Sequence, residues 1–214
     1  MATSELPFPK LILQHSKLLV ALACVITLSI TVLSVTRHLT ADQIERNEQA
    51  WLEAQINVLV PAAMRDNDLL KDRTTMTAPE FFASDSPAII YRARRNGLPV
   101  AAVIRSITNE GYGGPIELLV AVNYDGEVMG VRILSHHETP GIGNVFELPQ
   151  SHWLQQFTGR SLQNPSEAGW DVHKSGGQFE QFTSATITPH AIIKAVQHTL
   201  DFYQHRRDEI YLKS

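Results

Sequence analysis

The sequence has 214 residues, 43% of them hydrophobic, a formal net charge of -4 and one cysteine, Cys24. This length suits one domain with its own core plus an accessory segment, and the mildly acidic composition, without a Lys/Arg cluster, does not fit a nucleic-acid partner. A single cysteine excludes an intramolecular disulfide, a thiolate zinc site and an iron–sulfur cluster made by this chain alone, so redox chemistry here requires a bound cofactor.

An uncharged run without proline, from Leu18 to Val35, predicts a membrane-spanning helix. A helix over this run is roughly 27 Å long, close to the hydrocarbon thickness of a bilayer. A cleaved signal peptide would have a shorter apolar region and a small-residue cleavage site, and no such site follows the run. A lipoprotein anchor at Cys24 would require the apolar run to end there. We therefore expect an uncleaved anchor over residues 18–36 after a short cytoplasmic tail, residues 1–17, an orientation that the slight basic excess before the run favours.

The segment after the anchor, residues 37–85, begins with a predicted amphipathic helix over residues 40–60. The helix would start at Thr40 as its N-cap and end before Pro61. Residues 65–86 are polar and without a clear pattern, and we assign them no regular structure. The apolar face of the helix is expected to consist of Ile44, Trp51, Ala54 and Val58.

Two β-hairpins follow, each built around a dipeptide that suits the positive φ angles of a tight turn. The second hairpin contains an almost continuously apolar stretch, residues 116–122, which indicates a strand covered on both faces. The predicted strands are 88–94 and 99–107 around Asn96-Gly97, and 116–124 and 127–135 around Asp125-Gly126.

The C-terminal part of the chain is predicted to end in a long helix. It begins near Thr188-Pro189, a pair typical of an N-cap followed by the first helical residue. A short helix at 153–157 and a short strand at 170–173 precede it. We therefore expect an α+β domain over residues 86–206, with a mainly antiparallel sheet and a packed C-terminal helix, followed by a tail, residues 207–214.

Three hydroxyl residues, Thr183, Ser184 and Thr186, stand just before this helix. The N–H groups at a helix N-terminus lack internal partners and the macrodipole is positive there, so a phosphate on Thr186 would be favourably placed. A hydroxyl-rich turn that only caps the helix explains the same residues. Lys174 lies in a Ser-Gly-Gly turn, which by itself indicates a turn and no more.

The segment TSATITP resembles the flavinylation segment of the RnfG (RsxG) and NqrC family of FMN-carrying subunits, whose pattern is Asp-x-x-Ser/Thr-Gly-Ala-Thr. Glu180 takes the acidic position, Thr183 the first hydroxyl, Ser184 the glycine, Ala185 the alanine and Thr186 the acceptor. Glutamate in place of aspartate and serine in place of glycine are two departures from the pattern. Serine resists the positive φ and the close approach that glycine permits.

The likeness extends to residues 111–143 and 170–196 and is closer to RnfG than to NqrC. It implies FMN joined to Thr186 by a phosphoester, through a flavin transferase that splits FAD. It also implies an electron-relay subunit of an Rnf-type ion-translocating oxidoreductase complex, working with the other subunits in the bacterial inner membrane. The 86–206 domain would then be an FMN-binding domain on the periplasmic side. The further residues implied at the flavin are Thr183, Ser184, Ala185, Ile187, Glu138, Thr139, Pro140, Gly141 and Lys174.

Other kinds of site find little support in the sequence. Adjacent His136 and His137 would point to opposite faces of a strand, without further ligands at a suitable spacing, so we expect no metal site. The stretch 111–115 lacks the phosphate-loop spacing and precedes a strand, and no spacing identifies a nucleophile triad. We assign no catalytic residue to the chain. Two alternatives stay open: a structural or assembly subunit without flavin, and a sensor that binds FMN reversibly.

Overall fold

The structure is a computed structural model that describes residues 8–82, 87–147, 151–182 and 185–212. Its contacts divide the chain into two compact units, Met1–Trp51 and Leu52–Ser214. Each unit is described by itself. The second unit carries the sheet and the C-terminal helix.

Helix α1 (Phe8–Leu59) makes up the described part of the first unit and continues into the second. It contains a stretch that is long and apolar enough to cross a membrane, and the side chains from Leu18 to Val35 are exposed, as an anchor requires. The prediction of a separate helix with Thr40 as N-cap is wrong. The Thr40 hydroxyl donates to the carbonyl of Thr36 at 2.9 Å, a bond made within a continuous helix. No glycine or proline between residues 10 and 60 interrupts it.

The last turns of α1, in the second unit, pack on the sheet. Their buried side is formed by Leu52, Ile56 and Leu59, whereas Val58 is exposed. The apolar face that the sequence predicted is therefore the wrong one for this part of the helix, because the sheet selects a neighbouring stripe. The helix ends at Leu59, before Pro61, as predicted.

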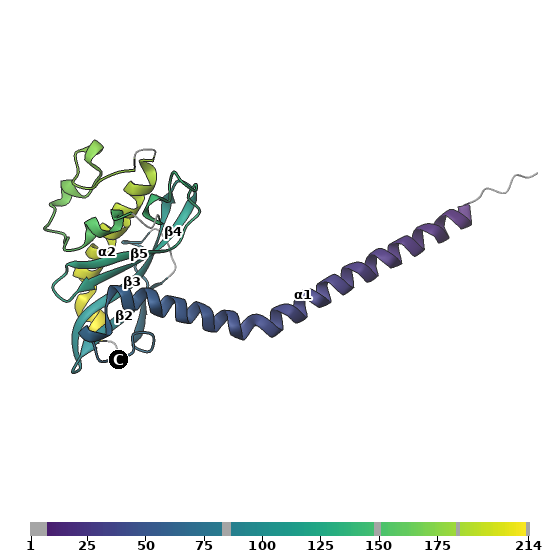
Figure 1. The fold of residues 1–214 in the computed structure, drawn as a ribbon, viewed down its shortest axis with the longest axis horizontal. Helices are drawn as coiled ribbons and strands as arrows, with labels where there is room; N and C mark the ends of the chain where they lie inside the picture. Colours follow the sequence, from purple (N-terminus) through teal and green to yellow (C-terminus); the bar gives the residue numbers. More distant parts are fainter. Residues whose placement is uncertain (1–7, 83–86, 148–150, 183–184, 213–214) are drawn as a thin grey trace, which may run out of the picture. The chain divides into compact units, whose positions relative to one another are not determined.

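The sheet is a five-stranded antiparallel meander in the order β1-β2-β3-β4-β5, with each strand next to its sequence neighbour (Figure 1). Both predicted hairpins are confirmed, and Asn96 and Gly97 have φ angles of 53° and 77°, as a tight turn of this kind needs. The edge strand β1 lies within residues 65–86, to which the sequence analysis assigned no regular structure. The strands are β1 (Arg73–Met76), β2 (Ala88–Arg95), β3 (Leu98–Gly111), β4 (Gly114–Asn123) and β5 (Val128–Ser135).

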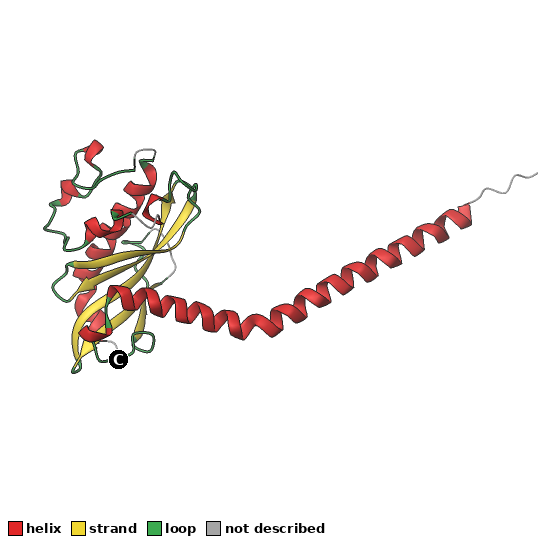
Figure 2. Cartoon of the chain, viewed as in Figure 1, coloured by secondary structure: helices red, strands yellow, loops and turns green. Residues whose placement is uncertain are grey.

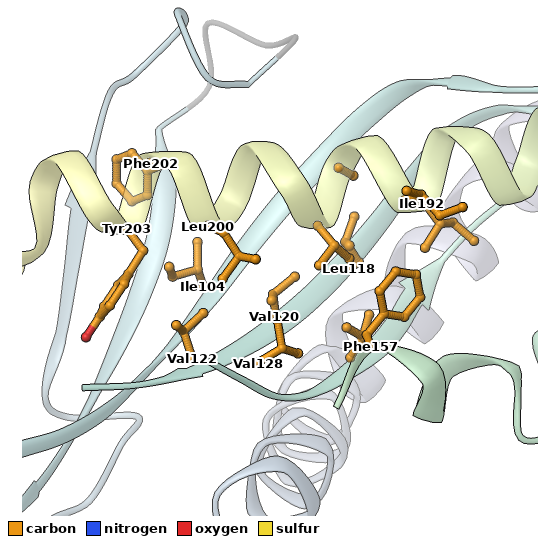
Figure 3. Packing of buried hydrophobic residues seen from close by; sticks show 14 of the residues in the cluster. Ile104, Leu118, Val120, Val122, Val128, Phe157, Ile192, Leu200, Phe202 and Tyr203 are labelled. Atoms are coloured by element: carbon orange, nitrogen blue, oxygen red, sulfur yellow. The ribbon is translucent and has the colours of Figure 1, made fainter. Parts of the chain in front are cut away.

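Helix α2 (Ile187–Leu212) covers one face of the sheet, and the last turns of α1 cover the other. Figure 3 shows side chains of β3, β4 and β5 meeting those of α2 in one core. Leu118 and Val120 of β4 face α2, while Leu119 and Ala121 face α1. All four are fully buried, which confirms the prediction of a strand covered on both faces. Burying such aliphatic side chains stabilises the fold by about 1.5–3 kcal/mol each.

The chain between β5 and α2 is irregular and carries short 3₁₀ helices (Figure 2). An aromatic cluster holds it together: the ring centroids of Phe157 and Phe179 lie 5.0 Å apart, and those of Trp170 and Phe179 lie 5.1 Å apart. The predicted helix at 153–157 is confirmed as a 3₁₀ helix. The predicted strand at 170–173 is wrong, because only Val172 forms a bridge, to Phe179. The 3₁₀ helices of the described chain are η1 (Ala62–Met64), η2 (Val145–Glu147), η3 (Trp153–Phe157), η4 (Glu167–Gly169) and η5 (His173–Ser175).

The C-terminal end of α2 is fastened to the sheet by arginines. Arg92 donates to the carbonyl of Ile210 at 3.3 Å, and Arg94 donates to the carbonyl of Tyr211 at 3.0 Å. Asp72, just before β1, pairs with Arg92 at 2.5 Å and with Arg94 at 3.0 Å. These cations satisfy helix carbonyls that have no intrahelical partner. Residues 207–212, which were predicted to belong to a C-terminal tail, are thus part of helix α2.

Candidate functional site

A cavity of about 590 Å³ lies at the N-terminal end of α2. Three separate segments enclose it: the turn between β3 and β4, the loop after β5 and the segment that enters α2. Its walls are mainly apolar, with a few hydroxyl groups and one carboxylate. The lining residues are Tyr112, Glu138, Thr139, Ile142, Gly143, Ala185, Thr186, Ile187 and Thr188.

Thr186 stands at the N-cap of α2 with an exposed side chain. Its carbonyl accepts the first intrahelical hydrogen bond, from the N–H of His190 at 3.2 Å. Pro189 has no N–H, so the first-turn donors of the helix are the amides of Ile187 and Thr188. The sequence placed the cap at Thr188, two residues too late. An anion on the Thr186 hydroxyl would lie near these two amides and the positive end of a 26-residue helix.

Glu138 links the three segments of the cavity wall. It is only 5% exposed. One carboxylate oxygen accepts a hydrogen bond from the Thr188 hydroxyl at 2.5 Å, and the other accepts one from the N–H of Gly113 at 3.0 Å. The carboxylate thus holds the glycine-rich turn and the first turn of α2 to its own loop.

Glycines allow the two loops to come this close. A Cβ on Gly113 would overlap the carbonyl group of His137, and a Cβ on Gly143 would lie 2.8 Å from a carboxylate oxygen of Glu138. Gly111 has the same restriction, because its Cβ would lie 2.8 Å from the other oxygen. The sequence showed only that residues 111–115 are not a phosphate loop and that they belong to the stretch that resembles RnfG. The structure shows that its glycines are required where the backbone packs against the Glu138 loop.

The other residues that the sequence assigned to the site lie at different distances from the cavity. Ala185 and Thr139 line it, together with Ile187. Pro140 and Gly141 belong to the same loop as Thr139 but do not line the cavity. Lys174 is exposed in η5 and does not line it either. Thr183 and Ser184 lie outside the described residues. Sequence reasoning missed Tyr112, Ile142 and Thr188, which become neighbours only through the fold.

Three of the side chains that line the cavity are apolar and exposed. Tyr112 is 72% exposed, Ile187 52% and Ile142 46%, although all three are large and hydrophobic. They come from the β3–β4 turn, the start of α2 and the loop after β5. Exposed apolar side chains gathered around a cavity are typical of a binding site for a ligand with an apolar ring or for another protein surface.

Glu180, which takes the acidic position of the predicted motif, lies on a second cavity of about 590 Å³. Its side chain is exposed, and its backbone is fixed by hydrogen bonds to η3: its N–H donates to the Gln156 side chain at 2.8 Å, and its carbonyl accepts from the Trp153 indole at 2.7 Å. Glu180 and Thr186, at the two ends of the predicted motif, thus lie on different cavities. The main chain of Glu180 is held by its hydrogen bonds to η3.

His136, which follows β5, has structural contacts. The ring of His136 packs edge-on against Phe146 with centroids 5.1 Å apart. Its Nδ1 accepts from the Glu138 N–H at 3.0 Å, and its Nε2 lies 2.8 Å from a carboxylate oxygen of Glu147. The hydrogen bond from His136 lowers the pKa of Glu147 below its ordinary value. No group of three or more His, Cys, Asp or Glu side chains that could hold a metal occurs within the part of the chain that the structure describes.

The fold and this cavity define a class of protein. The family of FMN-binding domains matches residues 111–201, which include the whole cavity wall. The chain therefore contains an FMN-binding domain, and the predicted α+β architecture with an apolar N-terminal helix is confirmed.

Comparison with curated sequences narrows the class. The chain is 41% identical over 177 residues to the G subunit of the ion-translocating oxidoreductase complex of Vibrio parahaemolyticus, covering 83% of each chain. It is 40% identical over 205 residues to the G subunit from Pseudoalteromonas atlantica, covering 96% of this chain and 94% of the relative. It is 38% identical over 178 residues to the G subunit from Shewanella oneidensis, covering 83% of this chain and 84% of the relative. The chain belongs to the family of G subunits of ion-translocating oxidoreductase complexes, as its resemblance to RnfG indicated.

The residues of the cavity fit FMN. A volume of about 590 Å³ is within the ordinary range of sites for small ligands and cofactors. The apolar side chains of Tyr112, Ile142 and Ile187 suit the flavin ring, while the amides of Ile187 and Thr188 at the start of α2 suit its phosphate. Among the described residues that line the wall, the one charged side chain, Glu138, is turned toward Thr188 and Gly113.

Proposed function

We propose that this chain is the electron-transfer subunit of a membrane-bound ion-translocating oxidoreductase complex of the Rnf type, with FMN linked by a phosphoester to Thr186. Three observations support the proposal. The relatives carry that complex's name, the FMN-binding domain contains the cavity, and Thr186 lines the cavity beside a helix N-terminus.

The position of Thr186 is the observation that carries the covalent link. In the proposed attachment, a flavin transferase supplies FAD, and a bond forms between the Thr186 Oγ and the phosphorus of the FMN half. The bond to the AMP half breaks, AMP leaves, and the hydroxyl proton passes to the transferase. The side chain is exposed, so the enzyme can reach it without unfolding α2. The product is a phosphodiester anion, which the amides of Ile187 and Thr188 can stabilise.

Bound FMN supplies the electron-transfer chemistry, and the protein fixes its place and surroundings. Thr186 retains the cofactor, Tyr112, Ile142 and Ile187 provide apolar contact, and Glu138 keeps the walls of the cavity together. A link through the phosphate leaves the ring system chemically unchanged. Its benefit is retention, since outside the cytoplasm a lost FMN would not readily be replaced.

The place of the chain in the membrane is part of the same proposal. The apolar stretch of α1 would anchor it in the inner membrane, with residues 1–17 in the cytoplasm and the FMN-binding domain in the periplasm. The partners would be the other subunits of the complex, and the flavin transferase during maturation. The slight basic excess before the apolar stretch supports this orientation.

The test is intact mass spectrometry of the full chain produced together with a flavin transferase. We expect one added FMN in the wild type and none in Thr186→Val, with the flavin fluorescence of the denatured band lost in parallel. Thr158→Val removes an exposed hydroxyl that does not line the cavity and serves as the matched control, which should keep the added mass.

The same measurement separates the alternatives. A wild-type chain without added mass that binds no flavin would be an assembly subunit. A chain that binds FMN but releases all of it on denaturation would be a reversible binder. Unmodified Thr186 in the presence of the transferase would contradict the covalent link, and Ser184→Gly then shows whether the serine is the cause.

A further inference from the structure

Glu138 places a charged side chain in the wall of the cavity. Its carboxylate is buried, and the described groups that hydrogen-bond to it, the Gly113 amide and the Thr188 hydroxyl, are both neutral. A buried charge is costly unless its surroundings compensate for it. Here the compensation comes from two hydrogen bonds and from the N-terminal end of α2, which carries a positive partial charge.

The same end of α2 would receive the FMN phosphate. Thr186 caps the helix, and Thr188, which binds Glu138, lies in its first turn. The helix end therefore faces two anionic groups: the carboxylate from the loop after β5 and, in the proposed flavoprotein, the phosphodiester on Thr186. Glu138 and the flavin share one cavity and one source of positive potential.

We propose that Glu138 is a positioning residue for the flavin, and that its negative charge lowers the reduction potential of the flavin. The inference rests on the proposed function. Through Thr188, Glu138 fixes the first turn of α2, on which the phosphate sits. Through its charge, it opposes the addition of electrons in the cavity, because a fixed negative charge in a poorly solvated site raises the free energy of any further negative charge nearby.

Two nearly isosteric substitutions separate charge from shape. Glu138→Gln keeps an oxygen that accepts from Gly113 and gains an N–H that can donate to the Thr188 oxygen, so both hydrogen bonds survive while the charge is lost. Thr188→Val keeps the shape of the side chain and removes the donor to Glu138.

Two further variants serve as controls. Glu127→Gln makes the same change of charge in the exposed β4–β5 turn. Thr199→Val removes a buried hydroxyl of α2 that bonds to the carbonyl of Ala195.

The experiment uses the full chain in detergent, produced with the flavin transferase, and combines intact mass with potentiometric titration of the flavin absorbance. We expect Glu138→Gln to carry FMN and to show a more positive midpoint potential than wild type. Glu127→Gln should match wild type, since solvent and salt screen an exposed charge. Thr188→Val should lower the flavinylated fraction severalfold, Thr188→Ser should restore it, and Thr199→Val should not change it.

The outcomes decide between a role for the charge and a purely structural role. A Glu138→Gln chain that carries FMN at the wild-type midpoint overturns the inference, as does a shift no larger than that of Glu127→Gln. If Glu138→Gln folds but lacks FMN, Glu138→Asp decides: retention of FMN by the aspartate variant supports a need for the charge, and its loss contradicts it. A wild-type chain without FMN on Thr186 overturns the proposed function itself. That result is seen in the wild type, so it is distinct from a failure of the inference about Glu138, which is seen in the Glu138→Gln variant.

Discussion

Replacing Gly113 with alanine tests how tightly the cavity wall is packed. The new methyl group would overlap the carbonyl of His137 and lie 3.0 Å from the Glu138 nitrogen, both backbone groups that cannot rotate away. One of the two loops must move by on the order of 1 Å, and such overpacking costs about 1–3 kcal/mol. The same movement strains the hydrogen bond from the Gly113 amide to the Glu138 carboxylate, which contributes about 1.5–3 kcal/mol because its acceptor is charged.

Together these effects predict a loss of roughly 3 kcal/mol in the free energy of unfolding. For a unit of this size the melting temperature changes by about 2–4 °C for each kcal/mol, so we expect a drop of roughly 6–12 °C. The assay is thermal unfolding of the purified full chain, followed by circular dichroism, with intact mass to measure FMN content. We also expect a reduced flavinylated fraction, because the moving loops form two walls of the cavity.

The control is Gly97→Ala in the β2–β3 turn. An added Cβ there meets nothing within 4 Å, although φ is +77°, so the variant carries a backbone penalty of about 1 kcal/mol and no clash. Its FMN content should equal that of wild type. The reasoning about the cavity wall would be refuted if Gly113→Ala melted at the wild-type temperature or no lower than Gly97→Ala.

Three further predictions concern the core, the sheet edge and the pH dependence. Leu118→Ala, in the core under α2, should lower the free energy of unfolding by about 2–5 kcal/mol in a denaturant titration, whereas Leu98→Ala at an exposed site should change it little. Asp72→Ala should lower the free energy of unfolding by about 3–5 kcal/mol, because it leaves the buried guanidinium of Arg92 without its carboxylate. A loss no larger than that of a surface substitution would show that the ion pair does not stabilise the fold. Burial raises the pKa of Tyr211 from 10.0 to about 12. The contribution of the buried neutral phenol to the free energy of unfolding is therefore fully present below pH 10 and is lost as the pH rises toward 12. Alkaline titration of phenolate absorbance should therefore show one fewer late-titrating tyrosine in Tyr211→Phe than in wild type; an unchanged number of tyrosines titrating late would contradict the assignment.

The hairpins could be predicted because their signals are local. Asn96-Gly97 fixes a turn by its own backbone preferences, and the apolar run of β4 indicates burial on both faces without knowledge of its neighbours. The edge strand β1 could not be predicted, since its four residues, RTTM, carry no strand pattern. It forms because Met76 pairs with Ala88 of β2 and because Asp72 before it reaches two arginines of the sheet.

The candidate site, too, could be predicted only in part from the sequence. Thr186 was assigned to the site from a short motif, because this residue and the helix start are neighbours in the sequence. The contact between Glu138 and Thr188 spans 50 positions of the chain and exists only after α2 has packed on the sheet. The choice of buried stripe on α1 also depends on the sheet, which explains why Leu52 and Ile56, rather than Ala54 and Val58, face inward.

The order of the strands has a consequence for the protein outside its complex. A meander leaves its first and last strands at the margins, where unpaired main-chain groups can recruit strands from other molecules and start aggregation. At the last strand, the N–H and carbonyl of Val128 are already bonded to Arg160 and Gly159, at 2.8 Å each. At the first, β1 offers only four residues, one of them the exposed Arg73. The start of β5 is thus covered and β1 is short, and both features disfavour intermolecular pairing, a useful property for a subunit of a complex before it is assembled.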